Sequence, residues 1–250
     1  SNLLKIAAAI LAITGSVFLF RSIFISTGSS QIMAATFKAD DQKTFIELPD
    51  GSKVWLNKNT QLSYTENFND ENRTIYMTGE AYFEVARNEK KPFIIHAGNT
   101  ITKVLGTGFN LRCYENEKAA ELTVSHGKVS FGINEKEVIL EKDYKGVIDT
   151  KDLRATKEFN DDPNVFAWKD EKLIFNNMPF LKVDSTLEKY FSIAIEVKTD
   201  DINNCRFTGS FEKPQIEDVM EVLKVTMGLD YLQQANTITV QGVCQTDTLQ

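Results

Sequence analysis

Hydrophobic and polar residues follow three different patterns along the chain, and each pattern predicts a different kind of structure. Residues 3–25 are almost entirely apolar, and the two charges among them, Lys5 and Arg21, stand near the ends of the run. A helix of this length spans about 35 Å at about 1.5 Å per residue, which exceeds a hydrocarbon core of about 30 Å. We therefore expect a transmembrane helix over residues 3–25 and a linker over residues 26–43.

A cleaved secretory signal peptide is the alternative for this segment, with Ala34 and Ala35 as its cleavage site. The apolar run is longer than the hydrophobic region of a usual signal peptide, and Arg21 lies inside it. Both features favour a retained anchor. One cation flanks each end, so charge does not set the orientation of the helix.

In residues 44–156 apolar positions alternate with polar ones in short runs that are separated by turn residues. This period of two predicts antiparallel β-strands. The clearest hairpin joins residues 45–48 to 53–56, where Pro49 presets φ and Gly51 permits a positive φ. Further strands are expected at 73–78, 81–86, 93–97, 100–105, 108–114, 121–125, 128–131 and 137–141. So many strands without helices predict an antiparallel all-β domain, either a sandwich or a solenoid-like fold.

After an acidic connector near residues 157–163, the apolar positions change to a helical period. The region 164–242 is expected to form a small α/β domain of order βαββαβ with a final hairpin strand, in which two helices cover one face of a sheet. Pro214 before the second helix and Gly228 after it act as start and stop signals. Strands are expected at 173–176, 193–198, 206–209, 231–233 and 237–240, and the helices begin near Pro179 and Ile216.

Three stretches of the middle region resemble the signature motifs of the FecR domain, in the family's order and spacing. They run over residues 48–57, 79–85 and 105–111, and Pro92-Phe93 between the second and third also matches. The residues that carry the family motif are Pro49, Asp50, Gly51, Gly79, Glu80, Phe83, Gly106, Thr107 and Phe109. Residues 164–242 resemble the domain that accompanies FecR domains, with Trp168 and residues 173–175, 207–211 and 237–240, and this domain is similar in layout to secretin and TonB N-terminal (STN) domains.

The resemblance implies a single-pass inner-membrane anti-sigma factor whose C-terminal region is periplasmic and which is not an enzyme. It would sense the signalling domain of a TonB-dependent outer-membrane receptor and control an extracytoplasmic-function sigma factor in iron or glycan uptake. The cytoplasmic segment that grips the sigma factor in this family has no counterpart in these 250 residues. Regulated proteolysis in the linker is the expected route of the signal.

We expect the receptor domain to bind by strand addition at a sheet edge of the C-terminal domain, at residues 193–198 or 237–241. The partner-binding residues would then be Ile193, Ile195, Val197, Ile238 and Val240. Acidic residues outnumber basic ones in this domain, which predicts a neutral or basic partner surface. The alternative function is a periplasmic glycan-binding or envelope scaffold protein, which requires a concave aromatic strip on one sheet face.

Charge, cysteine content and histidine content exclude further classes of function. A net charge of -7 disfavours nucleic-acid binding. The cysteines Cys113, Cys205 and Cys244 are odd in number and widely spaced, so they predict neither a disulfide framework nor a metal site. His96 and His126 are the only histidines, and neither has a second ligand at helical spacing. We expect no metal and no cofactor.

The candidate catalytic arrangements also fail on spacing. Gly106-Thr107-Gly108 lacks the helix and the lysine of a phosphate-binding loop. Glu80 and Glu84 would share one strand face about 13 Å apart, too far for a glycosidase pair, and are expected to be solvated. Adjacent strand residues such as Ser125 and His126 point to opposite faces, so they should not form a nucleophilic couple. We predict no catalytic site.

Overall fold

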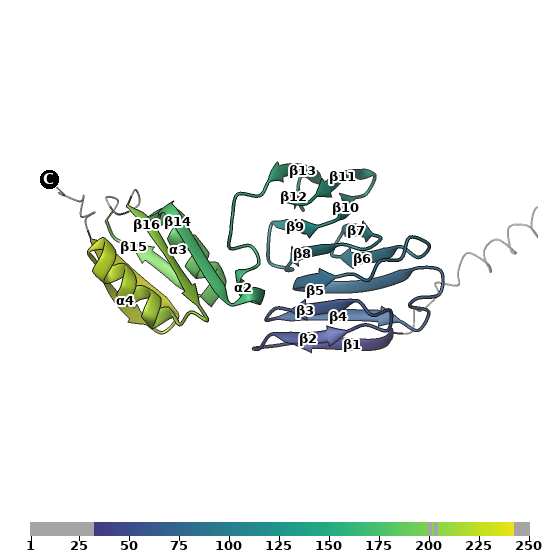
Figure 1. The fold of residues 1–250 in the computed structure, drawn as a ribbon, viewed down its shortest axis with the longest axis horizontal. Coiled ribbons are helices and arrows are strands. Elements are labelled where there is room, and N and C mark those ends of the chain that lie inside the picture. Colours follow the sequence, from purple (N-terminus) through teal and green to yellow (C-terminus); the bar gives the residue numbers. More distant parts are fainter. Residues whose placement is uncertain (1–32, 200–201, 203–204, 243–250) are drawn as a thin grey trace, which may run out of the picture.

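The chain folds into two units that lie side by side in a computed structural model (Figure 1), which describes residues 33–199, 202 and 205–242. The strand-rich unit comes first, and a smaller α/β unit follows it. The transmembrane helix expected at residues 3–25 lies outside the described residues. Within the described ranges, no helix combines the length and the apolar character that a membrane crossing needs.

The strand-rich unit contains 13 strands in one continuous hydrogen-bonded system. They are β1 (Met33–Ala39), β2 (Thr44–Glu47), β3 (Lys53–Leu56), β4 (Thr60–Thr65), β5 (Arg73–Glu84), β6 (Phe93–Ala97), β7 (Thr100–Val104), β8 (Gly108–Cys113), β9 (Ala119–His126), β10 (Lys128–Ile133), β11 (Lys136–Glu141), β12 (Tyr144–Asp149) and β13 (Arg154–Phe159). The expected strand-rich domain is therefore confirmed, and its strands form one large sheet.

The long strand β5 belongs to two layers. Its first half pairs with β4 and, in parallel, with β6, whereas its second half pairs with β3 and β8. One layer has the order β1-β4-β5-β6-β7-β10-β11, and the other has the order β2-β3-β5-β8-β9-β12-β13. Gly79, with φ +109°, stands where β5 changes partners, and a Cβ there would lie 2.4 Å from Thr60 Oγ1. Glycine is required at this crossing.

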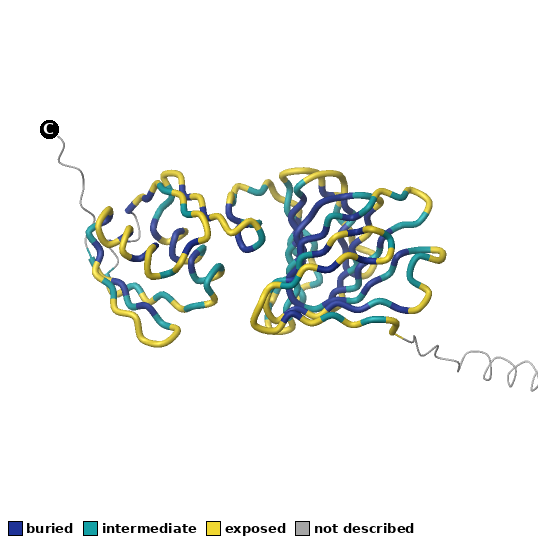
Figure 2. Tube along the Cα trace, turned by 60° about the horizontal axis from the view of Figure 1, so that its bottom comes forward, coloured by how far each residue is buried: buried dark blue, intermediate teal, exposed yellow. Residues whose placement is uncertain are grey.

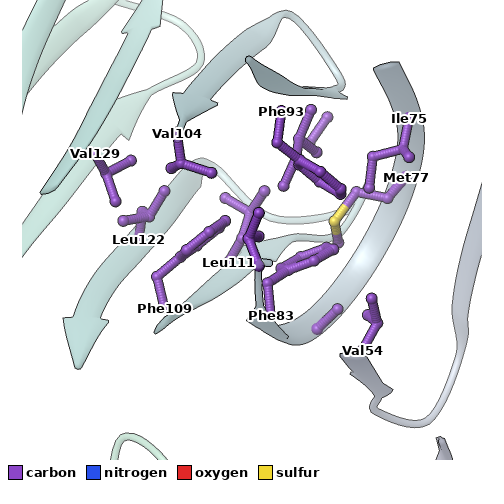
Figure 3. Close-up of a cluster of buried hydrophobic side chains, with 14 of the residues drawn as sticks. Val54, Ile75, Met77, Phe83, Phe93, Val104, Phe109, Leu111, Leu122 and Val129 are labelled. Atoms are coloured by element: carbon purple, nitrogen blue, oxygen red, sulfur yellow. The ribbon is translucent and has the colours of Figure 1, made fainter. Parts of the chain in front are cut away.

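Side chains from the inner faces of both layers form one apolar core. Phe83 stacks on Phe109 with 5.2 Å between ring centroids and meets Phe93 of the other layer at 6.2 Å (Figure 3). Figure 2 shows the buried positions following the strands through this unit. Phe83 and Phe109 are both fully buried, so these two family-motif residues serve packing, and truncating either to Ala should cost about 3–5 kcal/mol.

Several strands depart from the sequence expectation because their alternating pattern is weak. β1 lies inside the expected 26–43 linker, but it pairs with β4 along its whole length, so this part of the linker expectation is wrong. β4 was missed because its buried positions include the polar residues Thr60, Ser63 and Thr65. β13 extends into the expected connector and is mostly exposed, as an edge strand can be. The pairing of β5 with β6 is parallel, although an antiparallel domain was expected.

The α/β unit begins at a short helix, α2 (Ala167–Asp170), and its elements follow in the expected order. They are β14 (Lys172–Pro179), α3 (Phe180–Phe191), β15 (Ala194–Val197), β16 (Arg206–Glu212), α4 (Ile216–Met227), β17 (Leu229–Gln234) and β18 (Thr237–Gly242). The expectation of one sheet is wrong, because β14 and β16 form one small sheet and β15-β18-β17 form another. Helices α3 and α4 each contact strands of both sheets, so the unit has one shared core. Apolar periodicity identifies elements but not which strands pair.

Candidate functional site

Several family-motif residues brace the strand-rich unit from inside. The Asp50 carboxylate accepts a hydrogen bond from Arg73 Nη1 at 2.9 Å, and the two side chains are 4% and 1% exposed. Arg73 also donates to the main-chain carbonyls of Lys91 and Ala86, while Asp50 accepts from the N–H of Ser52. A buried pair with this many partners fixes the β2–β3 turn against β5. Asp50 therefore acts in the fold and offers little surface to a partner.

The motif at Gly106-Thr107 is also structural. A Cβ on Gly106 would lie 2.6 Å from Arg87 Cα, so only glycine fits. Thr107 is buried, and its Oγ1 donates to the carbonyl of Lys128 at 2.9 Å. The Thr107 carbonyl accepts from the N–H of Val85 at 3.1 Å. These contacts fasten the β7–β8 connection to the end of β5.

Glu80 is buried, which corrects the expectation that it is solvated. It is 1% exposed, and it accepts hydrogen bonds from Asn57 Nδ2, Asn110 Nδ2 and Arg112 Nη1, each at 2.9 Å. Alternation along β5 does place it on the outer face of its layer. That face is covered here by α2 of the second unit, which the sequence pattern of β5 could not reveal.

The two units meet where α2 docks on this outer face (Figure 1). Trp168 is 7% exposed, and its Nε1–H donates to Asn110 Oδ1 at 3.0 Å. Phe166 meets the Tyr82 ring edge-on at 5.7 Å, and Lys169 Nζ lies 4.7 Å from the centre of the same ring. The contact combines apolar burial, a buried hydrogen bond and a cation–π pair. The two units are thus held together by specific side-chain contacts in addition to the connecting chain.

Ser125 and His126 lie on the same side of the strand-rich unit, which corrects the expectation of opposite faces. The register of β8 against β9 shifts between Gly108 and Phe109, so a β-bulge interrupts the alternation. Tyr82 Oη lies 2.9 Å from Ser125 Oγ and donates to Glu84 Oε2 at 3.3 Å, while Glu84 Oε1 lies 2.8 Å from His126 Nε2. Tyr82 and Glu84 link the serine to the histidine through hydrogen bonds, and Ser125 and His126 form no hydrogen bond with each other, so the serine has no general base.

The predicted partner-binding residues separate into two groups. Ile238 and Val240 are buried on β18, which is the central strand of its sheet and has no free edge, so that half of the strand-addition expectation is wrong. Ile195 and Val197 lie on β15, which is an edge strand, and Ile193 precedes it. The outward N–H of Ile195 donates to Glu188 Oε1 at 2.7 Å. A partner strand would meet an edge that α3 already protects at one position.

A second sheet edge is closed by a side chain. Asn164 Nδ2 donates to the carbonyl of Ile174 at 2.8 Å, and the N–H of Ile174 donates to Asn164 Oδ1 at 2.7 Å. The amide thereby satisfies the outer side of β14 as a neighbouring strand would. Such protection limits unwanted edge pairing.

Cys205 is disulfide-bonded, which the spacing of the cysteines did not predict. Cys113 is a free thiol, and burial raises its pKa. A raised pKa makes a thiol less reactive, so Cys113 is a poor nucleophile. Disulfides persist in oxidising compartments such as the periplasm and are rare in the cytosol.

Comparison with known proteins gives consistent matches to both units. The model of the FecR protein family matches residues 34–130, and the model of the FecR C-terminal domain matches residues 172–240. Crystal structures of a candidate anti-sigma factor from Parabacteroides distasonis, at 1.65 Å and 2.50 Å resolution, both align with a TM-score of 0.64 and 26% sequence identity. The alignments cover 82% and 84% of this chain and 98% and 99% of the respective other chain. No curated protein matches the chain.

Proposed function

Because the chain belongs to the FecR family, we propose that it is the anchor and periplasmic part of an anti-sigma factor that receives its signal from another protein. FecR proteins are regulators, and the chain is not an enzyme. The observation that carries the proposal is the pairing of a FecR unit with its C-terminal unit through a docked helix. The likeness to a candidate anti-sigma factor over both units supports the same function.

The proposed signal comes from the signalling domain of a TonB-dependent outer-membrane receptor and reaches an extracytoplasmic-function sigma factor. The sigma factor would be held by a cytoplasmic segment outside these 250 residues, and residues 3–25 would anchor the protein in the inner membrane. The disulfide at Cys205 supports a periplasmic location, because the cytosol keeps thiols reduced. Whether the system responds to an iron complex or to a glycan would be decided by the ligand that the receptor binds.

We place the receptor contact at the open edge of β15. The N–H groups of Ala194 and Lys198 donate to the carbonyls of Asn236 and Val240, so the N–H and carbonyl of Val197 point away from the sheet. A strand of the receptor domain can pair with these groups after displacing Glu188 from Ile195. Main-chain pairing would give affinity, and the side chains of Ile195 and Val197 would give specificity.

The test replaces Val197 by Pro in the full chain and measures its affinity for the receptor's signalling domain by calorimetry. Proline removes an outward N–H without breaking the ladder to β18, so the unit should stay folded while binding is lost. Gln233→Pro is the matched control, because Gln233 lies on the opposite edge strand, next to the residue that closes the hairpin. Unchanged affinity in Val197→Pro would rule out the β15 contact.

We retain regulated proteolysis as the proposed route across the membrane, with a narrower target. β1 pairs with β4, so residues 33–39 would have to leave the sheet before a protease could bind them as an extended chain. Cleavage is therefore proposed at residues 26–32. Signalling in cells that keep this segment intact would contradict the route.

Glycan binding receives less support. The row of aromatic rings formed by Phe45, Trp55 and Tyr82 is the strip that such a function would need, with centroid distances of 5.1 Å and 5.7 Å. Phe166 and Lys169 cover its Tyr82 end. The row serves the junction of the two units, and only Phe45 is exposed.

A further inference from the structure

A basic cleft of about 390 Å³ lies between the two units. The strand-rich unit contributes Lys43 and Lys58, and the α/β unit contributes Glu171 and Lys213. Tyr190 and Phe191, at the end of α3, form part of its apolar wall. The cleft is therefore made by both units together and depends on the way α2 docks.

The charge of this cleft is opposite to that of the chain, whose net charge is -7. Lys43 Nζ lies 3.5 Å from Glu171 Oε1, and this pair neutralises itself. In the part of the chain that the structure describes, the ammonium groups of Lys58 and Lys213 form no ion pair. Two uncompensated cations thus face the cleft of an acidic protein, and they favour an acidic ligand.

The backbone at the cleft is strained at two residues that touch each other. Glu171 has φ +53° and Lys213 has φ +47°, and the N–H of Lys213 donates to the carbonyl of Glu171 at 2.7 Å. This left-handed conformation costs a residue with a Cβ about 1 kcal/mol relative to glycine. Glu171 is the left-handed residue that ends α2, and eight other non-glycine residues in the described chain also have a positive φ, so this backbone conformation alone does not mark a ligand site. The chain carries a glutamate and a lysine here, where glycine would fit without strain.

We propose that this cleft binds an acidic segment of a partner protein, with carboxylates on Lys58 and Lys213 and an apolar side chain against Tyr190 and Phe191. An inorganic anion would meet only exposed lysines, and an exposed ion pair contributes about 0–1 kcal/mol. A peptide that also covers the aromatic wall excludes water and gains apolar burial. The C-terminal unit as a whole was expected to favour a neutral or basic partner, and the cleft is a local exception.

The occupant has a structural consequence for the junction. A segment in this cleft would touch the β1–β2 and β3–β4 connections of one unit and α3 and the β16–α4 connection of the other, and so it would bridge both units. Binding would therefore stabilise the docked arrangement of α2. The identification of the partner as the receptor's signalling domain rests on the proposed function, whereas the acidic character of the segment rests on the cleft alone.

The experiment uses the full chain in detergent and a fluorescent peptide of alternating Glu and Leu residues, with a Gln-Leu peptide and inorganic phosphate as comparison ligands. The double variant Lys58→Glu, Lys213→Glu should weaken binding of the acidic peptide at least about tenfold, since two attractive contacts become repulsive. Lys90→Glu is the control, an exposed lysine outside the cleft. The double variant Lys58→Gln, Lys213→Gln, which only removes charge, should have an intermediate effect, and thermal unfolding checks that all variants fold.

Equal peptide affinity in the double variant and in Lys90→Glu would overturn the proposal. So would equal affinity for the Glu-Leu and Gln-Leu peptides, or phosphate that displaces the peptide at equal concentration, which would indicate a simple anion site. The titration of Val197→Pro with the receptor's signalling domain tests the proposed function separately from the cleft. Peptide binding without receptor binding would contradict the receptor contact and leave the cleft standing, and the reverse result would contradict the cleft alone.

Discussion

The indole N–H of Trp168 donates to the side-chain carbonyl of Asn110 at 3.0 Å, and this bond joins the two units at the buried centre of their interface. The other end of the same amide donates to Glu80, which also holds Arg112. A series of polar side chains therefore runs from α2 of the α/β unit to the outer face of the β5–β8 layer in the strand-rich unit. Because Trp168, Asn110 and Glu80 are buried, losing one of them leaves a buried polar group of a neighbour without its partner.

Replacing Trp168 by Phe should uncouple the units. The change keeps most of the apolar contact but leaves Asn110 Oδ1 without its donor, at a cost of about 1–3 kcal/mol. We expect calorimetry to resolve a separate, earlier transition for the α/β unit and proteases to cut faster near residues 160–166. Trp55→Phe is the control, since Trp55 packs at the same junction from the other side. Identical unfolding of the two variants would contradict the role of the bond.

Replacing Glu80 should destabilise the strand-rich unit far more than replacing Glu84. Glu80→Ala removes the shared acceptor of Asn57 Nδ2, Asn110 Nδ2 and Arg112 Nη1. Arg112 keeps its pair with Glu117, but each buried donor left without an acceptor costs about 1–3 kcal/mol. Glu84→Ala removes a partly exposed carboxylate, and its surface pair with His126 is worth about 0–1 kcal/mol. Urea unfolding followed by tryptophan fluorescence measures both. Similar losses for the two variants would mean that Glu80 is not buried as described.

Asp184 makes the stability of the α/β unit depend on pH. Burial raises its pKa from 3.8 to about 6, a hydrogen bond from the N–H of Ser185 lowers it, and Glu188 raises it. The folded state binds this proton more tightly than the unfolded chain does. The resulting stabilisation is complete below about pH 4 and is lost as the pH rises through about 6.

Asp184→Asn should therefore raise the free energy of unfolding at pH 8 by about 1–3 kcal/mol and change it little at pH 4. The exposed Asp70→Asn serves as the control and should have a small effect at both values. Chemical unfolding at pH 4 and pH 8 makes the comparison. A gain of the same size at both pH values would show that Asp184 does not titrate in this range.

Lys213 should show opposite effects on stability and on binding. Lys213→Gly relieves the left-handed backbone, whereas Lys213→Ala keeps it, so the Gly variant should be more stable than the Ala variant by about 1 kcal/mol. Both remove the ammonium group and should weaken binding of the acidic peptide alike. Thermal unfolding and peptide titration are measured on the same samples. If the Gly variant bound the peptide as tightly as the parent protein does, Lys213 would not be part of the binding site.

Cys205 should resist alkylation without reductant and react after reduction, whereas Cys113 should react in both cases. In the part of the chain that the structure describes, Cys205 is disulfide-bonded and Cys113 carries a free thiol. Alkylation of the unfolded, unreduced protein followed by mass spectrometry counts the labels. A label on Cys205 before reduction would contradict the disulfide and remove its support for a periplasmic location.

The sequence predicted elements well wherever apolar periodicity was strong. Helix α3 begins directly after Pro179, and α4 begins two residues after Pro214 and ends directly before Gly228, as these residues indicated. The expected final hairpin is also present, as β17 and β18. The same pattern could not tell that the strands divide into two sheets. Strand partners depend on packing between distant segments, and β18 consequently became a central strand where an edge was expected.

The site was the least predictable part, because it depends on contacts between the units. Glu80 was expected to be exposed to solvent, because the sequence pattern of β5 does not show that α2 covers its outer face. A bulge opposite Gly108 put Ser125 and His126 on one side, and strict alternation could not show this. Lys58 and Lys213 are more than a hundred residues apart in sequence, so only the fold brings them to one cleft.

The two units together are proposed to bind the signalling domain of another protein, and the chain catalyses no reaction. The most direct measurement is a calorimetric titration of the full chain with the signalling domain of its proposed TonB-dependent receptor. The account predicts saturable one-to-one binding that Val197→Pro abolishes and Gln233→Pro preserves. No heat of binding at protein concentrations of tens of micromolar, with both proteins shown to be folded, would contradict it.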